Sequence, residues 1–259
     1  MDTCNQMEIV KKQYQSAVNL NTRISIHDKY STNKTGFGNW IFSQYTFFPG
    51  CRILELGCGT GMQWEGKDRA VSECARLVLS DFSDGMIAAA QKNLKSYTTI
   101  EYQQIDIQHI PFSDESFDRV MANMMLYHVP DIAQALREVR RVLVPGGTFY
   151  CATYGENGIS AYLAELLRPY GMAGAANTAF TLQNGAHWLG AAFRHVERLD
   201  YADSLAVNDI DDFVDYIYSL PSMSALSPDV RGALHAELEK RTVGGVLTVP
   251  KEYGLFVCH

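Results

Sequence analysis

Short apolar runs alternate with segments of helical periodicity through the middle of the chain. Five runs have the length and composition of buried strands, and they lie at 51–56, 77–79, 100–105, 117–122 and 148–154. Before the last run, Asp131 is a good helix cap, and apolar residues recur at three- and four-residue steps from Ile132 to Leu143. Strands that alternate with helices predict a parallel, doubly wound α/β sheet, whose right-handed crossovers place successive helices on its two faces.

The residues before this block are predicted to be helical. Apolar positions of residues 6–28 recur on one face, and a second helix is expected at about 37–47, where Pro49 and Gly50 end it. We therefore expect an N-terminal helical segment at 1–48 and an α/β core at 49–154.

The residues after 154 are predicted to cover and complete this core. Residues 155–194 begin with a glycine- and alanine-rich stretch that contains a helical run, so we expect a cap inserted over the ligand edge of the sheet. Residues 195–259 are expected to complete the core sheet and to add helices. Their predicted elements are a strand at 196–201, helices at 208–220 and 228–241, and a hairpin of 246–249 with 254–257 whose last strand adds antiparallel to the sheet edge.

The composition is that of an ordinary globular protein, with 259 residues of which 47% are hydrophobic and 20% charged. No apolar run approaches the roughly 20 residues that span a bilayer. The N-terminus lacks a basic region followed by an apolar core, so we expect a cytoplasmic location. The six cysteines form no C-x-x-C pair, so no metal site is expected. A net charge of −7 weighs against a nucleic-acid substrate, because such proteins usually carry a basic patch.

A glycine-rich stretch directly follows the first predicted strand. Gly57, Gly59 and Gly61 stand at alternate positions, and Glu55 precedes them by two residues. Glycine lets the backbone turn sharply and lets a ligand approach main-chain atoms without a Cβ in the way. Ligands collect at the carboxyl ends of parallel strands, so this loop is the first candidate for a binding site.

The stretch resembles motif I of the class I S-adenosylmethionine-dependent methyltransferases, E-x-G-x-G-x-G, matched from Glu55 to Gly61. The dinucleotide fingerprint is instead G-x-G-x-x-G, so the third glycine comes one residue too early for it. In the methyltransferase family this loop wraps the methionyl part and the ribose of the donor. The resemblance therefore implies that Glu55, Gly57, Cys58 and Gly59 bind S-adenosylmethionine, with S-adenosylhomocysteine as the product.

A second motif follows the second predicted strand. The segment from Asp81 to Met86 is similar to the methyltransferase pattern D-x-S-x-x-M. An acid at this strand end can accept hydrogen bonds from both ribose hydroxyls, although a loop-capping carboxylate would have the same position. By resemblance, Asp81, Phe82 and Met86 join the donor site.

Two later strand ends extend the resemblance. In the family, an acid after the third strand meets the adenine amino group and the next backbone amide meets a ring nitrogen, which implies roles for Asp106 and Ile107. Asn123 follows the fourth strand and is added to the donor site. The block from L-R-E-V-R-R-V-L to P-G-G is also typical of the family. The implied fold is a Rossmann-like, mostly parallel seven-stranded sheet with an N-terminal helical lid and an inserted cap.

Methyl transfer from a sulfonium is an in-line displacement, so the protein mainly aligns the acceptor and excludes water. The loop after strand four faces the methyl group in this fold, so Tyr127 and His128 are the candidate catalytic residues. His128 has the chemistry of a base near neutral pH, and the alternative, which is the more common role of such a histidine, is to hold the loop by a backbone hydrogen bond.

The absence of two motifs narrows the range of possible acceptor molecules. Residues 123–126 lack the [DN]-P-P-[YF] pattern of many nitrogen methyltransferases, and no Pro-Cys dipeptide of cytosine C5 methylation occurs. A small-molecule acceptor is the better prediction, with RNA or protein as alternatives. A non-catalytic S-adenosylmethionine-binding protein also remains, and a nicotinamide-dependent oxidoreductase is disfavoured by the glycine spacing.

The N-terminal segment has one face of mixed chemistry. Arg23, His27 and Tyr30 stand at i, i+4 and i+7, so a continuing helix puts them on one side. Arg grips a carboxylate bidentately, and the donor's methionyl group carries one. We therefore add Arg23 and Tyr30 to the donor site and expect residues 14–33 to close over the donor as a lid. The alternative is a solvated helix face.

Overall fold

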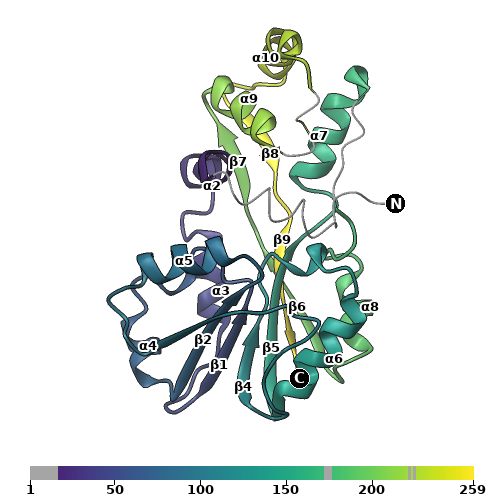
Figure 1. The fold of residues 1–259 in the computed structure, drawn as a ribbon. Helices are drawn as coiled ribbons and strands as arrows, with labels where there is room; N and C mark the ends of the chain where they lie inside the picture. Colours follow the sequence, from purple (N-terminus) through teal and green to yellow (C-terminus); the bar gives the residue numbers. More distant parts are fainter. Residues whose placement is uncertain (1–16, 172–176, 221–222, 224–225) are drawn as a thin grey trace.

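A seven-stranded sheet forms the centre of the structure, a computed structural model that describes residues 17–171, 177–220, 223 and 226–259 (Figure 1). Its strand order is β3-β2-β1-β4-β5-β9-β6. The strands are β1 (Arg52–Leu56), β2 (Arg76–Asp81), β3 (Ile100–Gln104), β4 (Phe117–Met121), β5 (Leu143–Tyr154), β6 (Val196–Tyr201) and β9 (Tyr253–Cys258). Strand β9 runs antiparallel to both of its neighbours, and the other six strands are parallel to one another. The predicted mostly parallel, doubly wound sheet is therefore confirmed.

Helices cover both faces of this sheet. Successive strand residues point to opposite faces, so Ile53 and Leu54 of β1 belong to different core clusters. One cluster joins the sheet to the helices α3 (Phe37–Gln44), α4 (Asp68–Glu73) and α5 (Asp84–Asn93). The other joins it to α6 (Ile132–Val142) and α8 (Gly185–Gly190). Burial on both faces explains why the strands read as continuous apolar runs.

The predicted helix before the fifth strand is α6. Asp131 caps it by accepting a hydrogen bond from the Gln134 backbone N–H at 2.9 Å. Its apolar stripe is buried against the sheet, as the periodicity predicts. The helix ends at Val142, and β5 begins at once, five residues earlier than the predicted run at 148–154.

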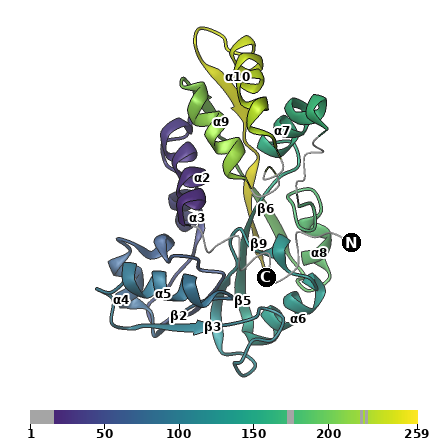
Figure 2. The same cartoon turned by 45° about the horizontal axis from the view of Figure 1, so that its top comes forward.

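A third hydrophobic cluster builds a cap above the carboxyl ends of β5 and β6 (Figures 1 and 2). It unites helices and a small two-stranded sheet from distant parts of the chain: α2 (Ala17–Tyr30), α7 (Ile159–Leu167), α9 (Ile210–Ser219), α10 (Arg231–Lys240), β7 (Ser204–Val207) and β8 (Leu247–Pro250). Residues 155–194 are therefore shared between the cap and the core. Helix α7 belongs to the cap, whereas Phe180, Leu182 and Leu189 pack in the core. Residues 195–259 divide in the same way, with β6 and β9 in the core sheet.

The expected hairpin of 246–249 with 254–257 is wrong. Strand β8 pairs antiparallel with β7, which lies some forty residues earlier, and not with β9. Strand β9 is also not at the sheet edge, because it lies between β5 and β6. The segment between β8 and β9 crosses from the cap to the core. Lys251 in this segment forms a buried ion pair with Asp203 and donates to Ser31 Oγ at 2.8 Å.

Two remaining expectations concern the chain ends and membranes. The predicted helix at 6–28 begins among residues outside the described part of the chain, and its described portion is α2. Among the described residues, no helix combines the length and apolarity that crossing a membrane requires.

Candidate active site

The glycine loop after β1 has the backbone that its sequence predicts. Gly57, Gly59 and Gly61 have φ angles of +75°, +56° and +77°, a region that side chains disfavour. A Cβ on Gly57 would lie 2.8 Å from Met125 Cγ, and one on Gly61 would lie 2.7 Å from Leu94 Cδ1. The loop therefore turns tightly between the loop after β4 and the end of helix α5, and a side chain at Gly57 or Gly61 would clash there.

One cavity of about 510 Å³ lies at this loop, a size within the range of small-molecule sites. Most of its walls are the loops at the carboxyl ends of β1, β2, β3 and β4, and α3 closes another side. Ten of the predicted site residues line it: Gly57, Cys58, Gly59, Asp81, Phe82, Met86, Asp106, Ile107, Asn123 and His128.

Asp81 joins two loops at this cavity. Its Oδ2 accepts a hydrogen bond from the Gly59 backbone N–H at 2.9 Å, and its Oδ1 accepts one from Ser83 N–H at 2.9 Å. Burial raises the pKa of this carboxyl, and the backbone N–H groups oppose the rise. The carboxylate thus faces the cavity while it orders the loops after β1 and β2.

Asp106 occupies the equivalent position after β3. Its Oδ1 accepts hydrogen bonds from the backbone N–H of Gln108 at 2.9 Å and from the Gln108 side-chain amide at 3.1 Å. Gln108 also lines the cavity, between Ile107 and the loop after β4. The carboxylate orientation is therefore set by a neighbour that the sequence analysis did not single out.

Glu55 does not line the cavity but lies buried beneath the glycine loop, with 3% of its surface exposed. Its Oε2 accepts a hydrogen bond of 2.6 Å from Nε1 of Trp64, a fully buried side chain. Burial raises the pKa of Glu55 from 4.5 to about 7, against the lowering effect of the Trp64 hydrogen bond. The structure thus gives Glu55 a supporting position under the loop instead of the donor contact that we expected.

Replacing Glu55 by Gln is expected to flatten the pH dependence of stability. Between pH 4.5 and about 7 the native Glu55 keeps a proton that the unfolded chain has lost. The free energy of unfolding that depends on this group therefore falls as pH rises through this window. Urea unfolding at about pH 5 and about pH 8 checks this. Parallel pH profiles for wild type and Glu55→Gln would show that Glu55 titrates normally in the native state.

The loop after β4 contributes both predicted and unpredicted residues. Asn123 lines the cavity, but its amide nitrogen donates to the Tyr45 hydroxyl at 2.6 Å and its Oδ1 accepts from the Ala152 backbone N–H at 3.3 Å. Met124 follows with a φ of +54°, unusual for a residue with a side chain. Such backbone strain gathers at functional sites. Because this residue is not a glycine, the sequence alone did not predict its left-handed backbone conformation.

His128 and Tyr127 have different surroundings. His128 lines the cavity, and burial lowers its pKa to about 4, so its imidazole is neutral at pH 7. Tyr127 is not among the residues that line the cavity. Its ring packs against Tyr154 with 4.8 Å between centroids, and its carbonyl oxygen accepts a hydrogen bond from the Asn177 side chain at 2.6 Å.

The two N-terminal candidates, Arg23 and Tyr30, are not brought to the cavity. The Tyr30 hydroxyl donates a hydrogen bond to Asp212 of α9, and Arg23 lies near enough to Tyr216 of α9 to lower the pKa of that phenol against the larger effect of burial. Helix α2 therefore packs within the cap, against α9. The next helix, α3, lines the cavity instead, through Phe37, Gly38 and Ile41.

The sequence analysis missed several further lining residues. Most lie outside the two motifs, although Leu56, Thr60 and Ser83 lie within them, and most are apolar or small: Phe37, Gly38, Ile41, Leu56, Thr60, Met62, Gln63, Ser83, Ile105, Gln108, Met124, Met125, Val129 and Pro130. Phe37 and Ile41 lie on the apolar face of a predicted helix, but that pattern does not reveal what the face covers. Within the described ranges, no group of three or more His, Cys, Asp or Glu side chains is placed to hold a metal ion.

Comparisons with known proteins agree with this geometry. Residues 54–151 match the family model described as a methyltransferase domain. The demethylmenaquinone methyltransferase of Lysinibacillus sphaericus is 32% identical over 135 residues, which cover 52% of this chain and 57% of that protein. The enzyme of the same name from Staphylococcus carnosus is 33% identical over 102 residues, 39% of this chain and 42% of its own. The chain thus matches about half the length of these relatives.

Solved structures support the fold. A putative methyltransferase from an antibiotic biosynthesis pathway of Anabaena variabilis has a TM-score of 0.62 at 13% identity, covering 86% of this chain and 96% of its own. The 4+2 cyclase SpnF has a TM-score of 0.59 at 20% identity, covering 96% and 95%. At such identities the likeness concerns the fold alone. Residues 54–151 therefore form a methyltransferase domain, with the sheet and the glycine loop that the resemblance to the class I S-adenosylmethionine-dependent family implies.

Proposed function

We propose that the protein binds S-adenosylmethionine in this cavity and transfers its methyl group to a small-molecule acceptor. The observation that carries the proposal is the meeting of three adjacent strand ends around one cavity: the glycine loop after β1, Asp81 at the end of β2 and Asp106 after β3. The order of these groups along the sheet corresponds to the order of the three parts of the donor. A glycine-rich loop that leaves its backbone accessible suits the methionyl part, one carboxylate suits a pair of ribose hydroxyls, and the second suits an exocyclic amino group.

The proposed roles follow from that order. Asp81 accepts hydrogen bonds from the ribose hydroxyls. Asp106 accepts one from the adenine amino group, and the Ile107 backbone amide donates to a ring nitrogen. The loop from Gly57 to Gly59 follows the methionyl part. Burial raises the pKa of Asp81, and pairing with hydroxyl donors in place of water favours its ionised form again.

The bound donor supplies an already activated methyl group, so the chain's own residues need only align the acceptor and exclude water. Apolar side chains line much of the cavity, among them Phe37 and Ile41 of α3 and Met124 and Met125 after β4. We propose that α3, rather than α2, is the part of the N-terminal segment that covers the donor.

The cavity lining also supports a small, uncharged acceptor. No lysine or arginine is among the described residues that line it, so within this part of the chain a phosphate-rich acceptor such as RNA would find no cationic partner at the cavity. Two matched relatives are named for methylation of demethylmenaquinone, an apolar small molecule. His128 is the polar side chain that we assign to the acceptor side. Its neutral imidazole is able to accept a proton, but a pKa near 4 makes it a weak base.

Transfer of a labelled methyl group tests the proposal. Purified protein with methyl-labelled S-adenosylmethionine is offered a demethylated quinol, simple phenols, amines, total RNA and a protein extract. Label is expected in an apolar small molecule. Label that enters only RNA or protein would overturn the acceptor class, and bound donor without transfer to any acceptor would favour a binding protein without turnover.

A further inference from the structure

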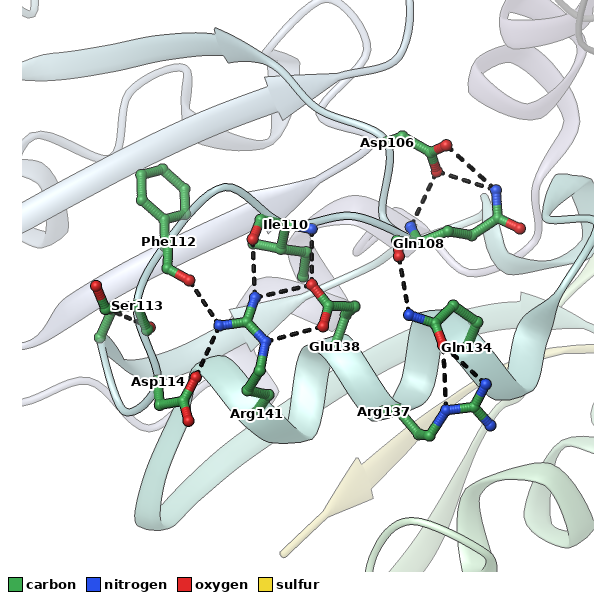
Figure 3. Close-up of polar contacts among 11 residues, drawn as sticks. Asp106, Gln108, Ile110, Phe112, Ser113, Asp114, Gln134, Arg137, Glu138 and Arg141 are labelled. Carbon is green, nitrogen blue, oxygen red and sulfur yellow. Dashed lines mark hydrogen bonds and ion pairs between the residues drawn. The ribbon is translucent and has the colours of Figure 1, made fainter.

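The loop between β3 and β4 is fastened to helix α6 by one arginine (Figure 3). Arg141, in the last turn of α6, uses all five N–H donors of its guanidinium. It donates to the carbonyl oxygens of Ile110 and Phe112 at 2.8 and 2.7 Å and to Asp114 at 2.9 Å. Its remaining two bonds are a fork of 2.8 Å each to Glu138. Such planar, multiply bonded contacts fix geometry as well as adding energy.

Glu138 also binds the loop between β3 and β4. Its Oε2 accepts a hydrogen bond from the Ile110 backbone N–H at 2.9 Å. Glu138 and Arg141 therefore satisfy both backbone groups of Ile110, a residue that is itself 3% exposed. The Glu138 side chain is 16% exposed, whereas Asp114 is 74% exposed. The contacts to Ile110 and Phe112 are thus the shielded ones, and the Asp114 ion pair is a weak surface contact.

A second attachment lies one turn earlier on the same helix face. Gln134 donates from its side-chain amide to the Gln108 carbonyl oxygen at 3.1 Å. The Asp131 backbone N–H donates to Gln108 Oε1 at 3.1 Å. Gln134, Glu138 and Arg141 are spaced at i, i+4 and i+7, so they share one face of α6. We call these three residues the α6 staple.

The α6 staple is connected to the cavity through Gln108. Gln108 holds the Asp106 carboxylate with its backbone N–H at 2.9 Å and with its side-chain amide at 3.1 and 3.3 Å (Figure 3). Asp106, Ile107 and Gln108 line the cavity, whereas the staple residues do not. The loop residues that face the cavity are therefore held from behind by a helix that is itself packed on the sheet.

We propose that the α6 staple positions Asp106 and the Ile107 amide for recognition of the donor's purine amino group. The inference rests on the proposed function, because it takes the cavity to be the donor site. Gln134, Glu138 and Arg141 are positioning residues, since they act through Gln108 and the loop and do not touch the donor. A carboxylate discriminates an amino group from a carbonyl only when it is held in place, so the staple should control purine selectivity more than overall fold.

The test compares two ligands that differ only at the purine. S-adenosylhomocysteine has the amino group, and its inosine counterpart has a carbonyl oxygen there. Wild-type protein should bind the adenine form at least about tenfold more tightly, as a hydrogen bond to a charged group implies. In Arg141→Met this ratio should fall below about threefold. Calorimetric titration with both ligands gives the ratio, and thermal unfolding records the fold.

Two further variants make the result decisive. Arg140→Met is the matched control, because Arg140 is the neighbouring arginine and, among the described residues, donates only to Leu143 O at 3.4 Å. Its ratio should equal that of wild type. Gln134→Ala removes one bond to Gln108 and should lower the ratio by a smaller factor, even if Arg141→Met fails to fold.

Three outcomes would overturn the inference. A variant that binds both ligands more weakly but keeps the wild-type ratio would show a purely structural staple. An unchanged ratio and affinity in both Arg141→Met and Gln134→Ala would show no role at all. If wild-type protein binds neither ligand, the proposed function fails and the inference with it, which distinguishes that failure from the first two.

Discussion

Replacing Asp81 by Ala is expected to weaken binding of S-adenosylmethionine at least tenfold. The substitution removes the proposed ribose contacts, and each hydrogen bond to a charged group contributes about 1.5–3 kcal/mol. It also removes the acceptor of the Gly59 and Ser83 backbone N–H groups, so the glycine loop loses its tie to the loop after β2. Both effects lower donor affinity, and isothermal titration with wild type and variant measures their sum.

Asp84→Ala is the matched control for this experiment. Asp84 is an acid three residues further on, is exposed and does not line the cavity. The control removes the same charge from the same region and should leave the dissociation constant within about twofold of wild type. An Asp81→Ala variant that is folded and keeps the wild-type dissociation constant would show that Asp81 only caps its loop.

Replacing Trp64 by Ala is expected to cost more stability than any other single truncation beneath the glycine loop. Removing a buried Trp side chain costs about 3–5 kcal/mol of the free energy of unfolding. Trp64 is fully buried, stacks with Phe47 at 5.9 Å between centroids and meets Phe42 edge-on at 5.7 Å. Its loss also leaves the buried Glu55 carboxyl without its N–H donor.

Two companion variants separate these contributions. Trp64→Phe keeps most of the ring volume and loses the N–H, so it should destabilise less than Trp64→Ala. Trp188→Ala removes the same residue type from a half-buried position on α8 and should cost less than either. Chemical denaturation followed by circular dichroism gives the three values. A Trp64→Ala variant within about 1 kcal/mol of wild type would contradict a role for this side chain in supporting the loop.

The core of the fold and much of the site could be predicted because they depend on local sequence. A buried parallel strand needs a continuous apolar run, and a tight turn beside a ligand needs glycine, so β1 and Gly57 are visible in the sequence. Asp81 and Asp106 were singled out because strand ends meet at one edge of a parallel sheet, and their contacts with the donor remain a prediction. The cavity lining agrees with these predictions.

The predictions that the structure does not support concern contact partners that the local sequence pattern does not reveal. Tyr30 faces Asp212, and helical periodicity gives a face but not its neighbour. Strand β8 pairs with β7 because β7 directly follows β6 and β8 directly precedes β9, so the antiparallel pairing of β6 with β9 continues into the cap. Proximity in sequence favoured the false hairpin. Glu55 was assigned to the donor because the motif contains it, whereas its hydrogen-bond partner, Trp64, looked like an ordinary apolar residue.

Titration of the wild-type protein with S-adenosylhomocysteine and, separately, with NAD tests the central claim most directly. The account predicts one saturable site for S-adenosylhomocysteine, weakened by Asp81→Ala, and no measurable heat with NAD. Saturable binding of NAD together with no binding of S-adenosylhomocysteine would contradict it.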